Sequence, residues 1–512
     1  MSRQLLKSTM VVSGMTFLSR VFGLVRDIVI ARYFGAGVAV DAFIVAFRIP
    51  NFLRRLFAEG GFSQAFVPVL AEYREQRGHE EVQALVDQTT ATLGLALLGV
   101  TAAGILAAPI LVMIFAPGFL HDSAKAQLAT GMLRVTFPYI FFISLTALAG
   151  GVLNTYRRFA VPAFTPVLLN LSMIGCAVWL SPRVAQPVTA LAWGVLIAGV
   201  AQLLCQVPFL LRLRLMPRPG LRRDRAGARR IIRLMLPTLF AVSVTQINLV
   251  VDTLVASFLV TGSISWLYYS DRMAQFPLGV FGVALATVVM PSLAAQHARG
   301  TPEQYSRTLD WAMRWVVLII VPAACGLAVL AVPLLTTLFQ YKSFSGFDVL
   351  MTSRSLIAYT VGLPAFVLIK VLASAFFARQ DTRTPVQAGV ASMLSNIVLI
   401  LILVLPLAHA GLALATSLAS YVNAGVLYWH LYRRGRFRPA PGWGRFLYKV
   451  VLAVAAMVAL LLLVTPAAAD WQAWPAPIRI GRLALYVTSG AACYFAMLWL
   501  SGIRQAEMTS PP

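Results

Sequence analysis

Charge is scarce in this chain. Only 12% of its 512 residues are Asp, Glu, Lys or Arg, against roughly 25% in ordinary soluble domains. Acidic residues are the scarcest, with 18 Asp and Glu beside 42 Lys and Arg. Hydrophobic residues make up 59% of the sequence. This composition argues against a soluble globular protein and predicts an integral membrane protein.

Cysteine and histidine are also rare, which argues against several kinds of chemistry. The four cysteines, Cys176, Cys205, Cys325 and Cys493, fall inside apolar stretches without CxxC or metal-ligand spacing. We interpret them as buried thiols. The five histidines lie in loops or near the ends of apolar stretches, and neither an HExxH motif nor a Ser/His/Asp set appears. We therefore expect that the protein is not an enzyme and that it holds no cofactor and no metal.

Apolar stretches of about 20 residues, the length that crosses a hydrocarbon core of ~30 Å, recur along the whole chain. The predicted fold class is an all-α polytopic membrane protein with about fourteen transmembrane helices. The predicted spans are 8–33, 39–59, 84–115, 127–153, 161–181, 188–211, 231–258, 264–294, 312–339, 350–377, 385–405, 411–431, 447–466 and 479–501.

Positive charge gathers in the linkers on one side of this topology. Nine arginines lie in residues 212–233, and six Lys or Arg lie in residues 433–449. The opposite loops hold only Lys125, Arg183 and Lys342. By the positive-inside rule, this asymmetry predicts that both termini are cytoplasmic. Because topology explains the net charge of +24, we expect no nucleic-acid partner.

The two halves of the chain repeat each other weakly. The Val-Leu pair at 152–153 and the Thr-Pro-Val run at 165–167 recur 219 residues later, at 371–372 and 384–386. The offset covers six spans, an even number, so the repeats run the same way through the membrane. We predict two related six-helix lobes with substrate held between them near the membrane midplane.

Charged residues interrupt spans one, two and eight, where hydrocarbon should exclude them. They are Arg20, Arg26, Asp27, Asp41, Arg48, Arg54, Arg55, Glu59, Asp271 and Arg272. One interpretation is structural ion pairing between neighbours, such as Arg26 with Asp27. The arginines outnumber the carboxylates, however, which predicts a cavity of net positive charge.

Guanidinium groups suit phosphate or pyrophosphate, because their planar fork donates two parallel hydrogen bonds and keeps its charge at any physiological pH. A membrane potential that is negative inside favours outward movement of an anion by about 2.3 kcal/mol per charge per 100 mV. Physical chemistry therefore predicts an exporter of an anionic substrate.

Several runs of the chain carry a family resemblance. They are Ser19–Asp27, Gly35–Gly37, Asp41–Phe43, Pro50–Gly60, Phe62–Pro68, Asn154–Thr155, Pro162–Pro166, Tyr269–Arg272, Phe339–Tyr341, Gln380–Asp381 and Thr384–Val386. Together they closely resemble the MurJ (MviN) family of lipid II flippases, over essentially the whole chain. That family lies within the multidrug/oligosaccharidyl-lipid/polysaccharide exporter superfamily.

The resemblance implies an N-terminal lobe over 1–212, a cytoplasmic Arg-rich linker over 213–230 and a C-terminal lobe over 231–433. Two further helices over 446–502 are expected to form a groove for a lipid tail. The implied activity is movement of lipid II, the undecaprenyl-pyrophosphate-linked peptidoglycan precursor, across the bacterial cytoplasmic (inner) membrane by alternating access.

The resemblance also implies which charged residues bind the substrate. The positions that match the family's cavity residues are Arg20, Arg26, Asp27, Asp41, Arg54, Glu59 and Arg272. We interpret Arg48, Arg55 and Arg134, which also lie in the first third of the chain, as structural.

Some members of the family carry a sodium site, to which Asp252 and Asn396 would contribute in this chain. No carboxylate lies between Pro385 and Pro406, so we expect the membrane potential to supply the energy. Two alternatives stay open: export of another undecaprenyl-linked oligosaccharide, and a non-transporting membrane scaffold. The expected partners are lipid II, membrane lipids and proteins of cell-wall synthesis or division.

Overall fold

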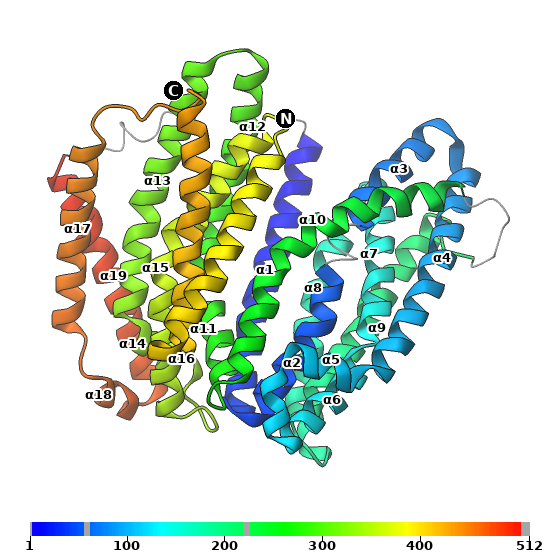
Figure 1. The fold of residues 1–512 in the computed structure, drawn as a ribbon, viewed down its shortest axis with the longest axis horizontal. Helices are drawn as coiled ribbons and strands as arrows, with labels where there is room; N and C mark the ends of the chain where they lie inside the picture. Colours follow the sequence, from blue (N-terminus) through cyan, green and yellow to red (C-terminus); the bar gives the residue numbers. More distant parts are fainter. Residues whose placement is uncertain (1–2, 56–61, 219–225, 503–512) are drawn as a thin grey trace. The chain divides into compact units, whose positions relative to one another are not determined.

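The computed structural model describes residues 3–55, 62–218 and 226–502, so Glu59 of the predicted site lies outside the described residues. The described residues are mainly helical and contain no strand, which confirms the all-α prediction. By contact the chain divides into two compact units, unit 1 (Met1–Ser265) and unit 2 (Trp266–Pro512). Figure 1 labels the helices of both units.

Unit 1 contains ten α-helices within its described residues. They are α1 (Arg3–Phe34), α2 (Val38–Arg54), α3 (Ser63–Gln76), α4 (Gly78–Leu106), α5 (Ala108–Phe115), α6 (Ser123–Thr136), α7 (Tyr139–Thr155), α8 (Ala160–Gly175), α9 (Thr189–Arg212) and α10 (Ala226–Ser257). The short helical turns of this unit are η2 (Pro117–His121), η3 (Cys176–Leu180) and η4 (Ser181–Arg183).

Unit 2 begins within α11 and ends beyond α19. Its helices are α11 (Ser263–Pro277), η5 (Leu278–Gly282), α12 (Val283–Ala298), α13 (Pro302–Val329), α14 (Ala331–Phe339), α15 (Gly346–Phe377), α16 (Arg383–Arg433), α17 (Trp443–Val464), α18 (Ala468–Ala473) and α19 (Ala476–Leu500).

The described part of every predicted span lies mainly on helical residues. Nine helices in the described part of the chain are long and apolar enough to cross a membrane. One of them, α16, holds predicted spans eleven and twelve, because its two halves meet at Ala408, whose backbone is not helical (φ 47°, ψ −127°). Predicted span eight is divided among α11, the π turn η5 and α12. The π turn follows Pro277, whose ring removes a backbone donor from the helix.

Helix α3 was not predicted. It has 14 residues and lies between predicted spans two and three. Its apolar residues Phe66 and Leu70 are fully buried, and the helix packs against α7. A helix of this length is too short to cross a membrane, so a search for stretches of about 20 apolar residues passes over it.

Each unit has its own packing arrangement. In unit 1, α8 packs against α1 and α9, and α2 packs against α6. In unit 2, α15 and α16 pack most extensively, and α17 and α19 lie side by side with α13 next to α17 (Figure 1). By contact α10 belongs to unit 1. The lobe boundaries at residues 212 and 231, which the family resemblance implies, stay a prediction.

The contact between α15 and α16 depends on a missing side chain. Gly362 of α15 is buried, and a Cβ atom built on it would lie 2.7 Å from the Cα of Ser417. The hydroxyl of Ser417, fully buried on α16, donates to the carbonyl of Ala358 at 2.8 Å. Because the obstructing atom belongs to the backbone, any side chain at 362 would push the two helices apart.

Gly362→Ala is therefore expected to destabilise the protein by about 1–3 kcal/mol, the usual cost of overpacking. The matched control is Gly425→Ala, on an exposed face of α16, where an added Cβ meets no atom within 4 Å. Thermal unfolding in detergent should show a lower midpoint for Gly362→Ala only. An equal midpoint for the two variants would contradict the close approach of the helices.

Candidate functional site

The best-defined charged cluster of unit 1 surrounds Arg26 on α1. Arg26 and Asp27 are 5% and 2% exposed. One carboxylate oxygen of Asp27, Oδ1, accepts from Arg26 Nε at 3.0 Å and from Nη2 at 2.7 Å. The predicted ion pair between these neighbours is therefore confirmed. Pairing of this kind is what allows a charge to be buried among apolar helices.

A third residue, Asn170 of α8, completes this cluster and was missed in the sequence. Its Oδ1 accepts from Arg26 Nη1 at 3.1 Å, and its Nδ2 donates to the carbonyl of Ser19 at 3.0 Å. Asn170 thus orients the guanidinium group while tying α8 to α1. The available signal was an amide side chain inside an apolar span, a type of residue that commonly bonds between membrane helices.

The arginines of α2 have different partners. Arg48 Nη1 donates to Thr253 Oγ1 at 2.6 Å, and Arg55 Nη1 donates to Gln246 Oε1 at 3.3 Å. Both acceptors lie on α10, so these two arginines link α2 and its C-cap residue to α10 within unit 1. Arg54 is half-buried and donates from Nε to Asn51 Oδ1, one turn earlier on its own helix, at 2.9 Å.

Asp41, at the start of α2, accepts four hydrogen bonds and is 1% exposed. Its Oδ2 accepts from Lys125 Nζ at 2.9 Å and from the Gly262 backbone N–H at 2.8 Å. Its Oδ1 accepts from the backbone N–H and the hydroxyl of Ser265, at 2.9 and 2.6 Å. The carboxylate therefore holds the last residues of unit 1, where α11 begins, against α2 and α6. Its negative charge also suits the N-terminal end of a helix.

Arg20 and Arg272 complete the described cations of the predicted site. Arg20 is exposed on α1, six residues before Arg26. Arg272 belongs to unit 2, where its guanidinium carbon lies 5.2 Å from the centre of the Tyr268 ring on the same helix. The neighbouring Tyr269 is fully buried. The predicted meeting of Arg272 with the arginines of spans one and two stays a prediction.

The predicted sodium ligands lie in different units. Asp252 is half-buried on α10 of unit 1. Asn396 of unit 2 is fully buried on α16, and neither polar atom of its side chain has a hydrogen-bond partner among the described residues. The Thr416 hydroxyl, on the other half of α16, is likewise without one. Helix α16 carries no Asp or Glu, so it offers no carboxylate to complement the neutral Asn396 side chain in binding a cation.

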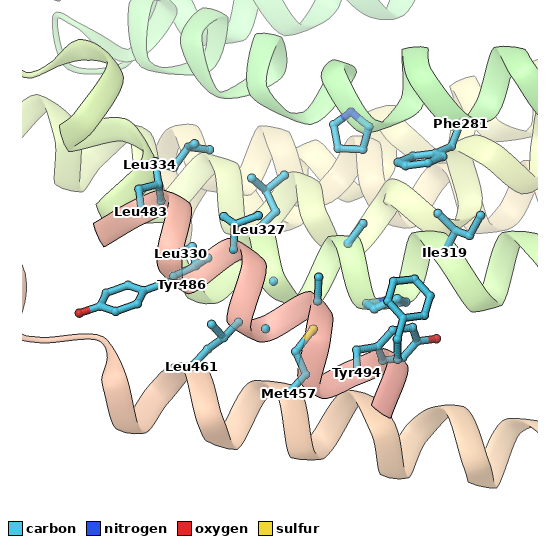
Figure 2. Close-up of a pocket in the computed structure, with 18 of the residues that line it drawn as sticks. Phe281, Ile319, Leu327, Leu330, Leu334, Met457, Leu461, Leu483, Tyr486 and Tyr494 are labelled. Atoms are coloured by element: carbon cyan, nitrogen blue, oxygen red, sulfur yellow. The ribbon is translucent and has the colours of Figure 1, made fainter. Parts of the chain in front are cut away.

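Unit 2 also contains an apolar groove of about 420 Å³, shown in Figure 2. Its walls come mainly from α13, α14, α17 and α19, with Leu327, Leu461 and Tyr494 among the lining side chains. The Tyr494 hydroxyl already has a partner, because it donates to the carbonyl of Leu318, another lining residue, at 2.7 Å. The lining holds no charged residue. The groove therefore suits a hydrocarbon chain rather than a polar head.

Comparison with solved structures first defines the class. An inward-facing multidrug resistance MATE family transporter of the MOP superfamily matches 83% of this chain and 97% of its own, with a TM-score of 0.66 and 14% identity. At this identity the likeness shows the fold alone. The chain is thus a multi-pass membrane protein with a fold shared by transporters of that superfamily.

Closer relatives define the family. The family model described as "Lipid II flippase MurJ" matches residues 30–474. A probable lipid II flippase MurJ of Vibrio cholerae is 45% identical over 99% of this chain and 98% of its own length. The lipid II flippase MurJ of Burkholderia cenocepacia is 44% identical over 98% of both chains.

A solved structure of a lipid II flippase MurJ in an inward closed conformation agrees with these matches. It covers 95% of this chain and 98% of its own, with a TM-score of 0.81 and 28% identity. The chain belongs to the MurJ family of lipid II flippases, as the resemblance in its sequence implied.

The buried Lys125–Asp41 pair generates a stability prediction. Lys125→Met leaves the Asp41 carboxylate buried without its cation, and such a change destabilises a protein by about 3–5 kcal/mol. The double variant Asp41→Asn, Lys125→Met removes both charges and is expected to recover part of the loss. Unfolding midpoints in detergent measure both effects. A double variant no more stable than Lys125→Met would show that the charge pair is not what stabilises this contact.

Proposed function

We propose that this protein is a lipid II flippase, which moves the undecaprenyl-pyrophosphate-linked peptidoglycan precursor from the cytoplasmic to the periplasmic leaflet of the bacterial inner membrane. The observation that carries the proposal is the match to lipid II flippases along nearly the whole of both chains. Flipping of lipid II requires two features of the protein: a site for the anionic head group and a path for the apolar tail.

The Arg26 cluster meets the first requirement. A guanidinium group buried among apolar helices is costly, and Asp27 and Asn170 hold it in one orientation. A pyrophosphate offers more charge and more acceptor oxygens than a single carboxylate, so it competes well for the same donors. We propose Arg26 as the principal head-binding residue, with Arg20, Arg54 and Arg272 as the further cationic positions. Asp41 and the undescribed Glu59 keep their predicted roles as acidic positions of the site.

The apolar groove of unit 2 meets the second requirement. Its lining is aliphatic and aromatic, and α17 and α19, which form one wall, are the two helices predicted to hold the lipid tail. Apolar contact of this kind needs no specific partner atoms and tolerates sliding of a flexible chain. We propose that the polyprenyl tail lies there while the head crosses the membrane by alternating access.

The membrane potential is the proposed source of energy. A pyrophosphate head carries negative charge, and a potential that is negative inside contributes about 2.3 kcal/mol per charge per 100 mV to its outward movement. Helix α16, which carries Asn396, has no carboxylate, so we propose no step through sodium. The positive-inside asymmetry supports cytoplasmic termini. Proteins of cell-wall synthesis or division are proposed partners.

A second candidate cargo is another undecaprenyl-linked oligosaccharide, because pyrophosphate is common to such lipids. Whole-length similarity to lipid II flippases favours lipid II. The non-transporting scaffold stays a less favoured proposal, since it leaves the buried arginine cluster and the groove without a use.

Arg26→Ala is expected to lower lipid II flipping at least tenfold. A hydrogen bond to a charged group contributes about 1.5–3 kcal/mol, and 1.4 kcal/mol corresponds to a factor of ten. Asn170→Ala keeps the positive charge of Arg26 but removes the hydrogen bond that orients its guanidinium group. We therefore expect a smaller loss of flipping than for Arg26→Ala. Flipping is measured in vesicles that contain purified protein and lipid II, by labelling the head group that reaches the far leaflet.

The matched control is Arg134→Ala, which removes an exposed arginine from α6 of the same unit. It should flip lipid II at the rate of the unchanged protein. Loading the same vesicles with another undecaprenyl-linked saccharide distinguishes the two candidate cargoes. Imposing a membrane potential or a sodium gradient on them distinguishes the two candidate energy sources. Undiminished flipping by Arg26→Ala would remove Arg26 from the site.

Gly326→Leu tests the groove. Gly326 lines it from α13, and an added Cβ would meet only the flexible end of a side chain, the Met457 Cε, at 3.9 Å and no backbone atom within 4 Å. The leucine side chain fills space that a tail would occupy. We expect severalfold slower flipping of full-length lipid II but unchanged binding of an analogue with a short tail. Gly425→Leu, on the exposed face of α16, is the control variant. If Gly326→Leu weakened its interaction with full-length lipid II and with the short-tail analogue equally, the groove would not be a tail site.

A further inference from the structure

A second cavity of unit 2 has the opposite character to the groove. It measures about 370 Å³, within the range of small-molecule sites. Four helix ends build it: the ends of α12, α15 and α16 and the beginning of α13. Its lining residues are Gln296, His297, Gly300, Thr301, Pro302, Tyr305, Arg379, Arg434, Gly435 and Arg436. Three arginines and a histidine thus line a cavity without an acidic lining residue, which we call the Arg379 cavity.

The arginines of the Arg379 cavity are not needed to cap the helices that end there. The three C-terminal helix ends, those of α12, α15 and α16, are each closed by a backbone hydrogen bond. Thr301 N–H donates to Gln296 O, Asp381 N–H to Phe376 O, and Arg436 N–H to Leu431 O. In the last case Gly435, at φ +63°, makes the left-handed turn that such a closure requires. These terminal carbonyls therefore already accept backbone hydrogen bonds. The guanidinium groups of the cavity are not required as donors to them.

One of the three arginines is already neutralised. Arg434 Nη1 donates to Asp381 Oδ2 at 3.1 Å. Burial alone would raise the pKa of Asp381, but hydrogen bonds from the Thr384 backbone and hydroxyl and from Arg434 lower it below its ordinary value. Asp381 is thus ionised at neutral pH, and its negative charge is paired with Arg434.

Arg379 and Arg436 have no carboxylate partner among the described residues. The Nε of Arg379 is buried and makes no hydrogen bond there, and on the same cavity wall the buried Oε1 of Gln296 accepts none. The Gln296 amide is held in place because its Nε2 donates to Thr308 Oγ1 at 2.8 Å. The cavity therefore presents unused cationic donors together with one fixed, unused acceptor.

We propose that the Arg379 cavity binds a phosphoglycerol group, whose phosphate would accept from Arg379 and Arg436 and whose hydroxyl would donate to Gln296. Guanidinium groups match phosphate geometry, and a hydroxyl donor is what the Gln296 oxygen lacks. The cavity lies at the ends of membrane-spanning helices, where head groups lie, and basic pockets in such places bind anionic lipids. The same chemistry is available from a phospholipid head group or from a free glycerol phosphate.

A basic helix end alone would be explained by the positive-inside rule and by the helix dipole. Neither requires a concave site, and neither leaves a guanidinium Nε and an amide oxygen buried without partners at its wall. Two arginines at the same end of unit 2 illustrate the difference. Arg383 and Arg438 are exposed and lie outside the cavity lining.

The test uses the full-length protein in two arms. In the lipid arm, the protein is placed in nanodiscs of phosphatidylcholine with increasing phosphatidylglycerol, and retained lipid is counted by native mass spectrometry. In the soluble arm, sn-glycerol 3-phosphate is titrated against protein in phosphatidylcholine nanodiscs. The variants are Arg379→Gln, Arg436→Gln and, as the control on the same loop, Arg438→Gln.

We expect at least one probe to bind the unchanged protein and to bind about tenfold more weakly to Arg379→Gln and Arg436→Gln, but not to Arg438→Gln. The arm that shows this pattern identifies the source of the ligand. Because Arg436 is exposed, its variant should fold even if Arg379→Gln does not. Failure of both probes to bind, or equal weakening by Arg438→Gln, would overturn the proposal. Flipping of lipid II in phosphatidylcholine vesicles tests the proposed function separately.

Discussion

A buried charge needs a partner of opposite sign or a set of hydrogen bonds, and unit 1 is organised by this constraint. Within its described residues, the two most enclosed ion pairs are Arg26–Asp27 and Lys125–Asp41. Arg26 of the first pair also donates to Asn170, which joins α8 to α1. Asp41 of the second pair also accepts from the Gly262 N–H, which holds the chain where it leaves the unit. In an apolar surrounding each partner is expensive to remove. The positions of several helices therefore depend on a small number of polar contacts.

The same constraint separates residues that hold the structure from those available to a substrate. Arg48 and Arg55 are hydrogen-bonded to side chains of α10, so their charges serve helix packing. Arg26 is held in one orientation by Asp27 and Asn170, which prepares its guanidinium group for an anion. In unit 2 the polar and apolar roles are divided between two cavities. The groove beside α17 and α19 carries no charge, and the Arg379 cavity carries no acid.

Much of the architecture was predictable because it depends on local composition. Stretches of about 20 apolar residues must form helices in a membrane, since no water is present to satisfy the backbone. Two irregularities lie next to prolines: the π turn directly follows Pro277, and the break at Ala408 lies two residues after Pro406. Helix α3 was missed because a helix of 14 residues does not meet the length criterion. The Arg26–Asp27 pair was predicted because its members are neighbours in the chain.

The partners of the other charges could not be predicted, because they come from distant parts of the chain. Lys125 lies 84 residues from Asp41, and Asn170 lies 144 residues from Arg26. The sequence by itself determined the helical class, the apolar spans and, through its matched runs, the family. Only the tertiary structure decided which cations are neutralised, where the uncharged groove lies and which arginines line a cavity. Hydropathy acts along the chain, whereas an ion pair or a cavity depends on which helices pack together.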